Sequence, residues 1–160
     1  MTWQLRRAET ADLDAIMAIE TSVFATDAWS REAMAGEIAD RHGYYVVAFP
    51  VGAPERIEAY AGLRAPRGAE QADIQTIAVV PGARGRGLGR VLVHTLIGEA
   101  RERGARELFL EVRADNPVAQ SLYTALGFEA IAVRPRYYQP DDVDAVVMRL
   151  VIPQPEVRPA

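Results

Sequence analysis

The residues between 84 and 90 combine arginine and glycine in a pattern that could bind a phosphate group. The segment Arg-Gly-Arg-Gly-Leu-Gly-Arg follows an apolar, strand-like run and precedes an amphipathic helical pattern. Glycine allows a close backbone approach that other residues forbid, and the free N–H groups in the first turn of a helix attract anions. We therefore expect a phosphate-bearing ligand at this turn.

Two familiar phosphate-binding motifs can be tested against this turn, and neither fits. A dinucleotide-binding G-x-G-x-x-G that starts at Gly85 would require glycine where Arg90 stands. A P-loop would require lysine and then serine or threonine after Gly87, but Leu88 and Gly89 follow. From the turn alone, the simpler alternative of a glycine turn with solvated arginines stays open.

The spacing Arg84-x-x-Gly87-x-Gly89 resembles the R/Q-x-x-G-x-G/A turn of the GNAT superfamily of N-acetyltransferases, which holds the pyrophosphate of acetyl-coenzyme A. Other runs are similar to the RimI branch of that superfamily, the ribosomal-protein alanine N-acetyltransferases. These runs are LFLEVRADN at 108–116, AQSLYTALGF at 119–128, RPRYY at 134–138 and AWS at 28–30. Val80 and Ala83 depart from the pattern, which has an acidic and an aromatic residue there. The similarity covers nearly the whole chain.

The resemblance implies that acetyl-coenzyme A is a substrate and that no metal takes part. The pantetheine arm of the coenzyme would bind along the edge of a strand, as a neighbouring strand would. The coenzyme-binding residues so implied are Ile77, Ala78 and Val79 for the pantetheine, Arg84, Gly85, Arg86, Gly87, Leu88, Gly89 and Arg90 for the pyrophosphate, and Asn116. Asn116 before Pro117 is also typical of a helix cap, and the two roles can coexist.

Glu111 and Tyr123 could move the protons of an acetyl transfer. An amine attacks a thioester only when it is neutral, and an α-amine with a pKa near ~8 is roughly a tenth neutral at pH 7, so a modest base suffices. The resemblance makes Glu111 the proton acceptor, whereas strand alternation also allows it to point to solvent. The resemblance makes Tyr123 the proton donor to the leaving thiolate, whereas its helical spacing with Leu122 and Leu126 also allows a core aromatic.

The resemblance places the acceptor among aromatic residues. Trp29, Tyr137 and Tyr138 would flank a protein N-terminus, such as that of a ribosomal protein; a packing role for at least one tyrosine stays open. We therefore expect an enzyme that acetylates a protein N-terminal α-amine directly, with no covalent enzyme intermediate. Two alternatives stay open: an acetyltransferase for small amines, and an acyl-coenzyme A-binding module without activity.

Composition narrows the remaining classes of protein. The 160 residues are 49% hydrophobic and 25% charged, as in a globular chain, and their net charge of -4 argues against a general nucleic-acid binder. Without cysteine there is no thiol nucleophile or cysteine metal site, and His42 and His94 have no metal-spaced partner. The longest apolar stretch, Tyr44 to Phe49, is too short to cross a membrane, and acidic residues near the N-terminus argue against a secretion signal. We expect a cytoplasmic protein. The sequence leaves the oligomeric state open, with a monomer as the favoured form.

Periodicity predicts the elements that must position these residues. Strands are expected at 3–7, 44–49, 57–63, 73–80, 107–112, 128–134 and 144–151, with a loop at 135–143. Helices are expected after the N-caps Thr10 and Ser30, from Leu88 to about Arg103, and after Asn116, the last one burying Val118, Leu122 and Ala125.

The order of these elements mixes hairpins with crossover helices, which predicts an α/β (α+β) mixed sheet with helices on its faces. The resemblance implies about seven mostly antiparallel strands with a central parallel pair, and about four helices. Residues 1–152 are expected to form a single domain, and 153–160 a loose tail that contains prolines.

Overall fold

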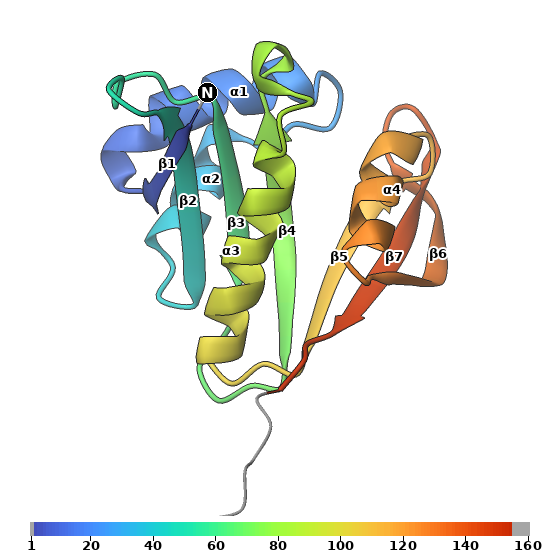
Figure 1. The fold of residues 1–160 in the computed structure, drawn as a ribbon. Coiled ribbons are helices and arrows are strands. Elements are labelled where there is room, and N and C mark those ends of the chain that lie inside the picture. The colour runs from blue at the N-terminus through green and yellow to red at the C-terminus, as the bar shows by residue number, and fades with distance from the viewer. Residues whose placement is uncertain (1, 155–160) are drawn as a thin grey trace, which may run out of the picture.

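The strands form one continuous sheet. The computed structural model describes residues 2–154, and it orders the strands β1-β2-β3-β4-β5-β7-β6 (Figure 1). They are β1 (Trp3–Arg7), β2 (Gly43–Pro50), β3 (Ala59–Arg64), β4 (Gln71–Val79), β5 (Glu107–Arg113), β6 (Glu129–Tyr138) and β7 (Val143–Val151). Neighbouring strands are antiparallel except β4 and β5, which are parallel. The expected mixed sheet with a central parallel pair is confirmed.

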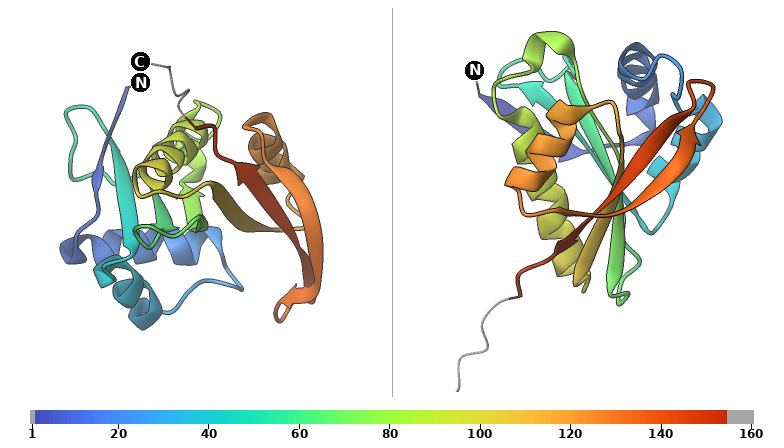
Figure 2. Two further views of the ribbon diagram at one scale, coloured as in Figure 1. Left: turned by 90° about the horizontal axis from the view of Figure 1, so that it is seen from below. Right: turned by 90° about the vertical axis from the view of Figure 1, so that its right-hand side faces the viewer.

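Four helices cover the two faces of the sheet: α1 (Leu13–Val23), α2 (Arg31–Ala39), α3 (Leu88–Glu102) and α4 (Pro117–Ala125). Helices α3 and α4 lie on one face, and α1 and α2 lie on the other (Figure 2). Ser30 begins α2 as expected, since its Oγ accepts a hydrogen bond from the N–H of Ala33 at 3.1 Å. Within residues 2–154, no helix is long and apolar enough to span a membrane.

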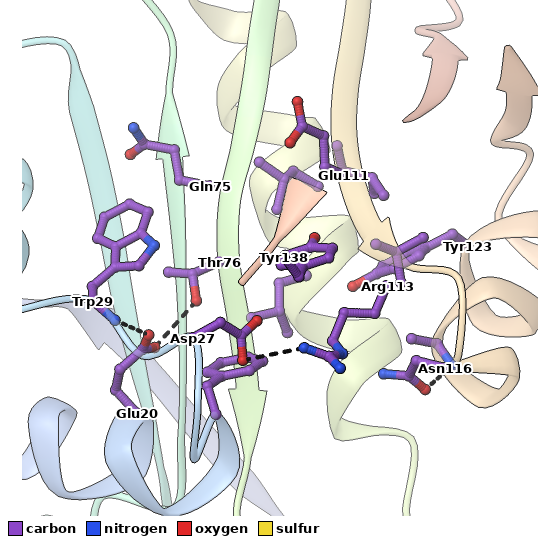
Figure 3. A pocket seen from close by; sticks show the side chains of 16 residues that line it. Glu20, Asp27, Trp29, Gln75, Thr76, Glu111, Arg113, Asn116, Tyr123 and Tyr138 are labelled. Atoms are coloured by element: carbon purple, nitrogen blue, oxygen red, sulfur yellow. Dashed lines mark hydrogen bonds and ion pairs between the residues drawn. The ribbon is translucent and has the colours of Figure 1, made fainter. Parts of the chain in front are cut away.

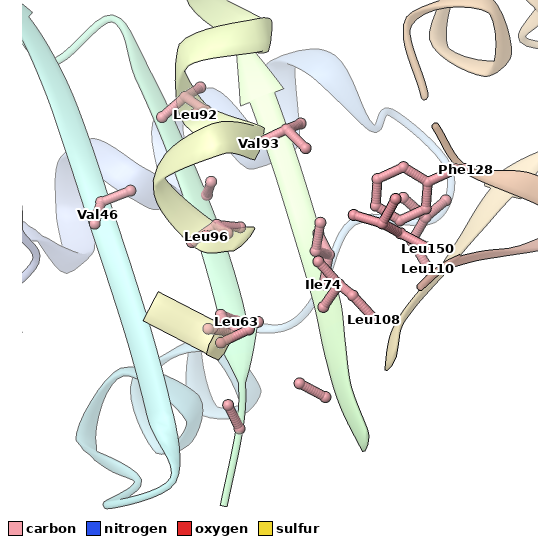
Figure 4. Close-up of a cluster of buried hydrophobic side chains, with 14 of the residues drawn as sticks. Val46, Leu63, Ile74, Leu92, Val93, Leu96, Leu108, Leu110, Phe128 and Leu150 are labelled. Atoms are coloured by element: carbon pink, nitrogen blue, oxygen red, sulfur yellow. The ribbon is translucent and has the colours of Figure 1, made fainter. Parts of the chain in front are cut away.

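Strand alternation divides the buried side chains between the two faces. On β2, Val46 belongs to the core under α3, whereas Val47 belongs to the core under α1 and α2. The larger core, under α3, continues across β4 and β5 to Phe128 and Leu150, and α4 packs against it (Figure 4). A single core therefore joins the two halves of the sheet.

β4 and β5 pair only at their first residues and then separate. The parallel ladder joins residues 71–73 to residues 107–109 and goes no further. On the other side of β4 the register shifts between Gly62 and Leu63 of β3, which leaves Gln75 without a partner. A bulge of this kind bends a strand, and the two strands diverge as a V (Figure 1). The open end of the V lies beside the glycine-rich turn.

A short 3₁₀ turn at Thr10–Asp12 precedes α1, so the prediction of Thr10 as the helix N-cap is wrong. Asp12 accepts a hydrogen bond from the N–H of Glu9 at 2.8 Å and pairs with Arg6 at 2.7 Å. Hydrogen bonding from Arg6 is the main reason why the pKa of Asp12 is lowered. A carboxylate from inside the turn, rather than the Thr10 hydroxyl, therefore fixes the start of this segment.

α4 turns a different face to the core from the one that periodicity predicts. The predicted stripe is wrong at Val118, which is 81% exposed, and at Ala125, which is exposed too, whereas Leu122 is half-buried. The side chains that pack against the core lie one position further along: Ala119, Tyr123 and Leu126. Both stripes are apolar at helical spacing, so periodicity alone cannot decide between them.

β6 extends to Tyr138 and so takes in part of the predicted loop at 135–143. Its pairing with β7 is irregular after Arg134, and Arg136 has a φ of 54°. The N–H of Arg136 donates to the carboxylate of Asp144 at 2.9 Å, which holds this irregular backbone. Tyr137 and Tyr138 therefore lie at the end of a strand, not in a loop.

The chain is fastened to the sheet just beyond β7. The N–H of Ile152 donates to the carbonyl of Arg106 at 2.9 Å. Of the tail expected at 153–160, residues 155–160 lie outside the described part of the chain. The single domain expected for 1–152 stays a prediction.

Candidate active site

Three adjoining cavities follow the gap between β4 and β5. The turn-side cavity, of about 920 Å³, lies beside the glycine-rich turn; the central cavity, of about 160 Å³, lies between the strands (Figure 3); and the outer groove, of about 420 Å³, reaches the end of β6. Asn116 and Tyr123 line the first two, and Glu111 and Tyr138 line the last two. The three cavities thus form one path that passes Glu111.

The glycine-rich turn presents unpaired backbone N–H groups. Gly85 and Gly87 have φ angles of 77° and 81°, in the left-handed region that favours glycine. Among the described residues, the N–H groups of Gly85, Arg86 and Gly87 form no backbone hydrogen bond. Gly87 is also the N-cap of α3 and has no side chain to satisfy the first turn of the helix. Such a turn attracts anions, so it fits a pyrophosphate.

The side chains of this turn are not equivalent. Arg84 and Arg90 line the turn-side cavity, whereas Arg86 is exposed and is not part of the cavity wall. Nε of Arg84 donates to the carbonyl of Val79 at 3.0 Å, which fastens the turn to the end of β4. Leu88 is buried in the core, so only its backbone is available to a ligand.

The edge of β4 faces the gap where the coenzyme arm is expected. After Asp73, β4 forms no further pairs with β5. Ile77, Ala78 and Val79 line the turn-side cavity, and their side chains pack against the two cores. Because the side chains serve packing, the backbone is what these residues can offer to an extended chain that carries amides.

Glu111 projects from β5 into the gap. Leu110 and Val112 beside it are buried in the core, so alternation directs Glu111 to the opposite face of the strand. Its side chain is 27% exposed, and Oε1 lies 3.3 Å from Nε of Arg134 on β6. The carboxylate borders the central cavity (Figure 3), where a ligand can reach it.

Tyr123 is both a packed ring and part of a cavity wall. Its ring meets the ring of Phe128 edge-on, with 5.9 Å between centroids, and the residue lines both the turn-side and the central cavity. Burial raises the pKa of Tyr123 to about 12. The hydroxyl therefore keeps its proton at neutral pH, as a proton donor must.

Asn116 caps α4, as one of its two expected roles requires. Its Oδ1 accepts a hydrogen bond from the N–H of Ala119 at 3.2 Å, and Pro117 occupies the first helical position. Within residues 2–154, the amide nitrogen of the Asn116 side chain donates to no protein group. The residue lines two cavities, so this donor can also face a ligand.

Trp29, Tyr137 and Tyr138 meet at the outer groove. The rings of Tyr137 and Tyr138 stand edge-on, with 5.1 Å between centroids. Hydrogen bonding with the Glu111 carboxylate, followed by burial, raises the pKa of Tyr137, and burial is the main cause that raises the pKa of Tyr138. Both hydroxyls stay protonated. The Tyr137 hydroxyl donates its proton to Glu111, whereas the Tyr138 hydroxyl can donate a hydrogen bond to a peptide backbone.

Glu20 of α1 is a polar residue of the site that sequence interpretation missed. It is 1% exposed and borders the central cavity. Its carboxylate accepts hydrogen bonds from the hydroxyl of Tyr60 and from the N–H of Trp29, the latter at 2.9 Å. Burial is the main cause of its raised pKa. Its position four residues after Ile16, on the buried face of α1, is the signal that could have found it.

Comparisons with known proteins place the chain in a family. Residues 11–128 match the model of the acetyltransferase (GNAT) family. The chain is 35% identical over 144 residues to the N-alpha-acetyltransferase RimI of Mycobacterium tuberculosis, covering 87% of this chain and 86% of that protein. It is 37% identical over 142 residues to the uncharacterized protein ML0378 of Mycobacterium leprae, where the match covers 87% of this chain but only 38% of the relative.

A solved structure extends the agreement to three dimensions. The crystal structure of the ribosomal-protein-S18-alanine N-acetyltransferase from Escherichia coli matches with a TM-score of 0.85 and 32% identity, over 97% of both chains. The resemblance inferred from the glycine-rich turn and from the runs at 108–116 and 119–128 is confirmed. With sequence, fold and family model in agreement over most of its length, the chain belongs to the acetyltransferase (GNAT) family of acetyl-coenzyme A-dependent enzymes.

Proposed function

We propose that this protein transfers the acetyl group of acetyl-coenzyme A to the N-terminal α-amine of another protein. The observation that carries the proposal is the path formed by the three cavities, which lets one substrate enter beside the turn and another enter from the outer groove. The two substrates meet at Glu111. The names of the relatives from Mycobacterium tuberculosis and Escherichia coli support the same class of acceptor.

The turn-side cavity holds the coenzyme. The pyrophosphate binds the free N–H groups of residues 85–87, with Arg84 and Arg90 nearby to neutralise its charge. The pantetheine arm follows the edge of β4, and the amide of Asn116 donates to it from α4. Val118, which is exposed on α4, borders the same cavity and gives the coenzyme an apolar contact.

Glu111 and Tyr123 divide the proton transfers between them. The amine nitrogen forms a bond to the thioester carbonyl carbon, and Glu111 accepts the proton that the nitrogen loses. The carbon–sulfur bond then breaks, the electron pair goes to sulfur, and the hydroxyl of Tyr123 donates a proton to the thiolate. Exchange with solvent restores both side chains, so the net result is one proton moved from nitrogen to sulfur.

The outer groove fits a polypeptide better than it fits a small amine. It continues past Glu111 along Trp29, Tyr137 and Tyr138, which leaves space for the residues that follow an N-terminus. The hydroxyl of Tyr138 supplies a donor for a backbone carbonyl of those residues. An N-terminal alanine, as in the ribosomal protein named for the relative from Escherichia coli, is the first acceptor to test.

Mass spectrometry of peptides incubated with the protein and acetyl-coenzyme A tests this proposal. One set has a free N-terminus and no lysine, and includes peptides that begin with alanine. The matched set has the same sequences with a blocked N-terminus and one internal lysine. We expect acetylation of the first set only, because an α-amine is neutral far more often than a lysine side chain at pH 7.

Each other outcome identifies a different activity. Equal acetylation of both sets would show a broader amine acetyltransferase. Turnover of free small amines but of no peptide would show the small-molecule enzyme, and binding of the coenzyme without turnover of any amine would show a binding module. All three results contradict the proposal.

A further inference from the structure

Arg113 is the last residue of β5, and its guanidinium contacts carboxylates from three separate loops. It donates to Asp115 in the β5–α4 loop at 2.9 Å and to Asp141 in the β6–β7 loop at 3.0 Å. A third carboxylate, from Asp27 between α1 and α2, lies 3.6 Å away (Figure 3). The Arg113 side chain is only 19% exposed. One cation therefore joins three segments that are far apart in the sequence.

These contacts close the open end of the V. The hydroxyl of Thr26 donates to the same carboxylate of Asp141 at 2.8 Å, which joins the α1–α2 loop directly to the β6–β7 loop. The first of these loops belongs to the half of the molecule with β1–β4, and the second belongs to the half with β5–β7 (Figure 1). The network thus links the two halves where their strands no longer pair.

The network borders both substrate sites. Asp27, Arg113, Asp115 and Asp141 all line the turn-side cavity. The guanidinium of Arg113 also lies 5.3 Å from the ring centroid of Tyr138, which lines the central cavity and the outer groove. A single side chain therefore contacts the wall of the coenzyme site on one side and an acceptor-site tyrosine on the other.

We propose that Arg113 is a positioning residue that couples the binding of acetyl-coenzyme A to the binding of the acceptor peptide. This inference rests on the proposed function. A ligand in the turn-side cavity excludes water from one side of the network, and ion pairs strengthen when water is excluded. The strengthened contacts hold the β6–β7 loop, and with it Tyr138 and the edge-on ring of Tyr137, in the position that receives the peptide.

Within the described part of the chain, Arg113 is the only positive charge that these three carboxylates contact in the network, so a neutral side chain cannot take its place. Three carboxylates surround one guanidinium, so the loss of Arg113 leaves like charges facing one another across the gap. Those charges push the α1–α2 and β6–β7 loops apart. Tyr138 then loses the cation beneath its ring.

Titration calorimetry with an alanine-initiated peptide that the wild-type enzyme acetylates tests the coupling. The peptide is titrated with and without coenzyme A, which binds without reacting. We expect coenzyme A to tighten peptide binding on the order of tenfold in the wild-type enzyme. By linkage, the peptide must tighten binding of coenzyme A by the same factor. In Arg113→Gln we expect this factor to fall to about one. Because the factor compares two peptide affinities within the same variant, with coenzyme A saturating in one of them, a weaker affinity for coenzyme A alone does not alter it.

Two further variants distinguish a positioning role of Arg113 from a general loss of stability: a control substitution of another arginine, and a double variant that removes one of the unpaired carboxylates. Arg149→Gln also removes an arginine of the sheet, one whose Nη1 lies 3.5 Å from Glu107, and it should keep the full coupling. Adding Asp141→Asn to Arg113→Gln relieves the repulsion, so it should recover melting temperature without recovering coupling.

Two results would overturn this inference while leaving the proposed function intact. One is an unchanged coupling factor in Arg113→Gln, and the other is a wild-type enzyme that acetylates the peptide but shows no coupling. Failure of the wild-type enzyme to acetylate any N-terminal peptide would overturn both proposals.

Discussion

At the scale of single residues, Tyr123 combines a packing contact with a hydroxyl, and one substitution separates them. Tyr123→Phe keeps the ring against Phe128 and removes only the proposed proton donor. We expect turnover to fall on the order of a hundredfold while the affinity for acetyl-coenzyme A stays the same. Steady-state thiol release and calorimetry measure the two quantities. Tyr44→Phe is the control, since that ring stacks with Arg7 and Arg103 rather than lining the site. Wild-type turnover in Tyr123→Phe would return this residue to a packing role.

Glu111→Gln tests the proposed base through its dependence on pH. We expect turnover at pH 7 to fall on the order of a hundredfold and the deficit to shrink by pH 9, because solvent then supplies more neutral amine. Tyr123 does not offset this gain. Burial raises its pKa to about 12, so its proton is lost only well above this range. Thiol release across the pH series, with melting temperatures recorded, measures the effect. A deficit that is constant from pH 7 to 9 would contradict the role of Glu111 as proton acceptor.

The candidate site could be predicted from sequence most readily where a motif marks it. Glu111 and Tyr123 stand in runs that resemble a family, so their roles could be proposed before the fold was known. Glu20 stands in no such run, and a glutamate in a helix ordinarily faces solvent. Its burial depends on Tyr60 of β3 and on the chain at Trp29, which only the folded structure brings to α1.

At the scale of elements, the glycine-rich turn depends on a backbone conformation that most residues avoid. In Gly87→Val the added Cβ meets no atom within 4 Å, so the cost at that atom comes from the φ of 81°. A left-handed residue costs about 1–2 kcal/mol, which lowers the fraction of competent turns, and hence coenzyme affinity, about 5- to 30-fold. Calorimetry with coenzyme A measures the loss. Gly82→Ala, in the same loop but without a left-handed φ, should bind normally. Equal affinity of Gly87→Val and wild type would contradict this account of the turn.

Secondary structure could be predicted well where one local signal dominates. Ser30 caps α2, and the apolar spacing from Leu88 gives α3 its correct extent. β6 could not be bounded in the same way, because Pro135 is typical of a strand end. In the fold, Pro135 lies in an edge strand, where a missing N–H is tolerated. Whether a strand continues through a proline depends on its place in the sheet, and a local stretch of sequence carries no information about that place.

At the scale of the whole molecule, acetyl-coenzyme A should stabilise the fold. A ligand that binds only the native state at a hundred times its Kd adds about 2.7 kcal/mol, which for a chain of this size raises Tm by about 5 to 11 °C. A thermal-shift titration measures this rise. S-acetylpantetheine, which lacks the pyrophosphate, should give a smaller shift at equal concentration if the free N–H groups of the turn bind phosphate. Equal shifts from both ligands would remove the phosphate assignment.

The class of sheet could be predicted from the order of strands and helices, but the gap within it could not. β4 separates from β5 near the bulge at Gln75, which the register shift leaves without a pairing partner on β3. The bulge is therefore defined by the pairing of β4 with β3, a strand from elsewhere in the sequence. Neither the composition nor the periodicity of residues 71–79 marks it. The cavities lie in the gap that this separation opens, so their volume could not be predicted from sequence patterns.

The irregular end of β6 also affects how the protein behaves at high concentration. β6 is an outer strand of the sheet, and Ile131 and Val133 are exposed on it. An exposed apolar edge is a template for pairing with another chain, and such pairing leads to aggregation. Pro135 has no N–H to offer. Arg136, with its left-handed φ, interrupts the hydrogen-bond ladder to β7, and Arg134 and Arg136 place a charge on each side of Pro135. The distortion that sets two tyrosines at the outer groove therefore also interrupts a template for aggregation, and a variant that straightened this strand would lose both.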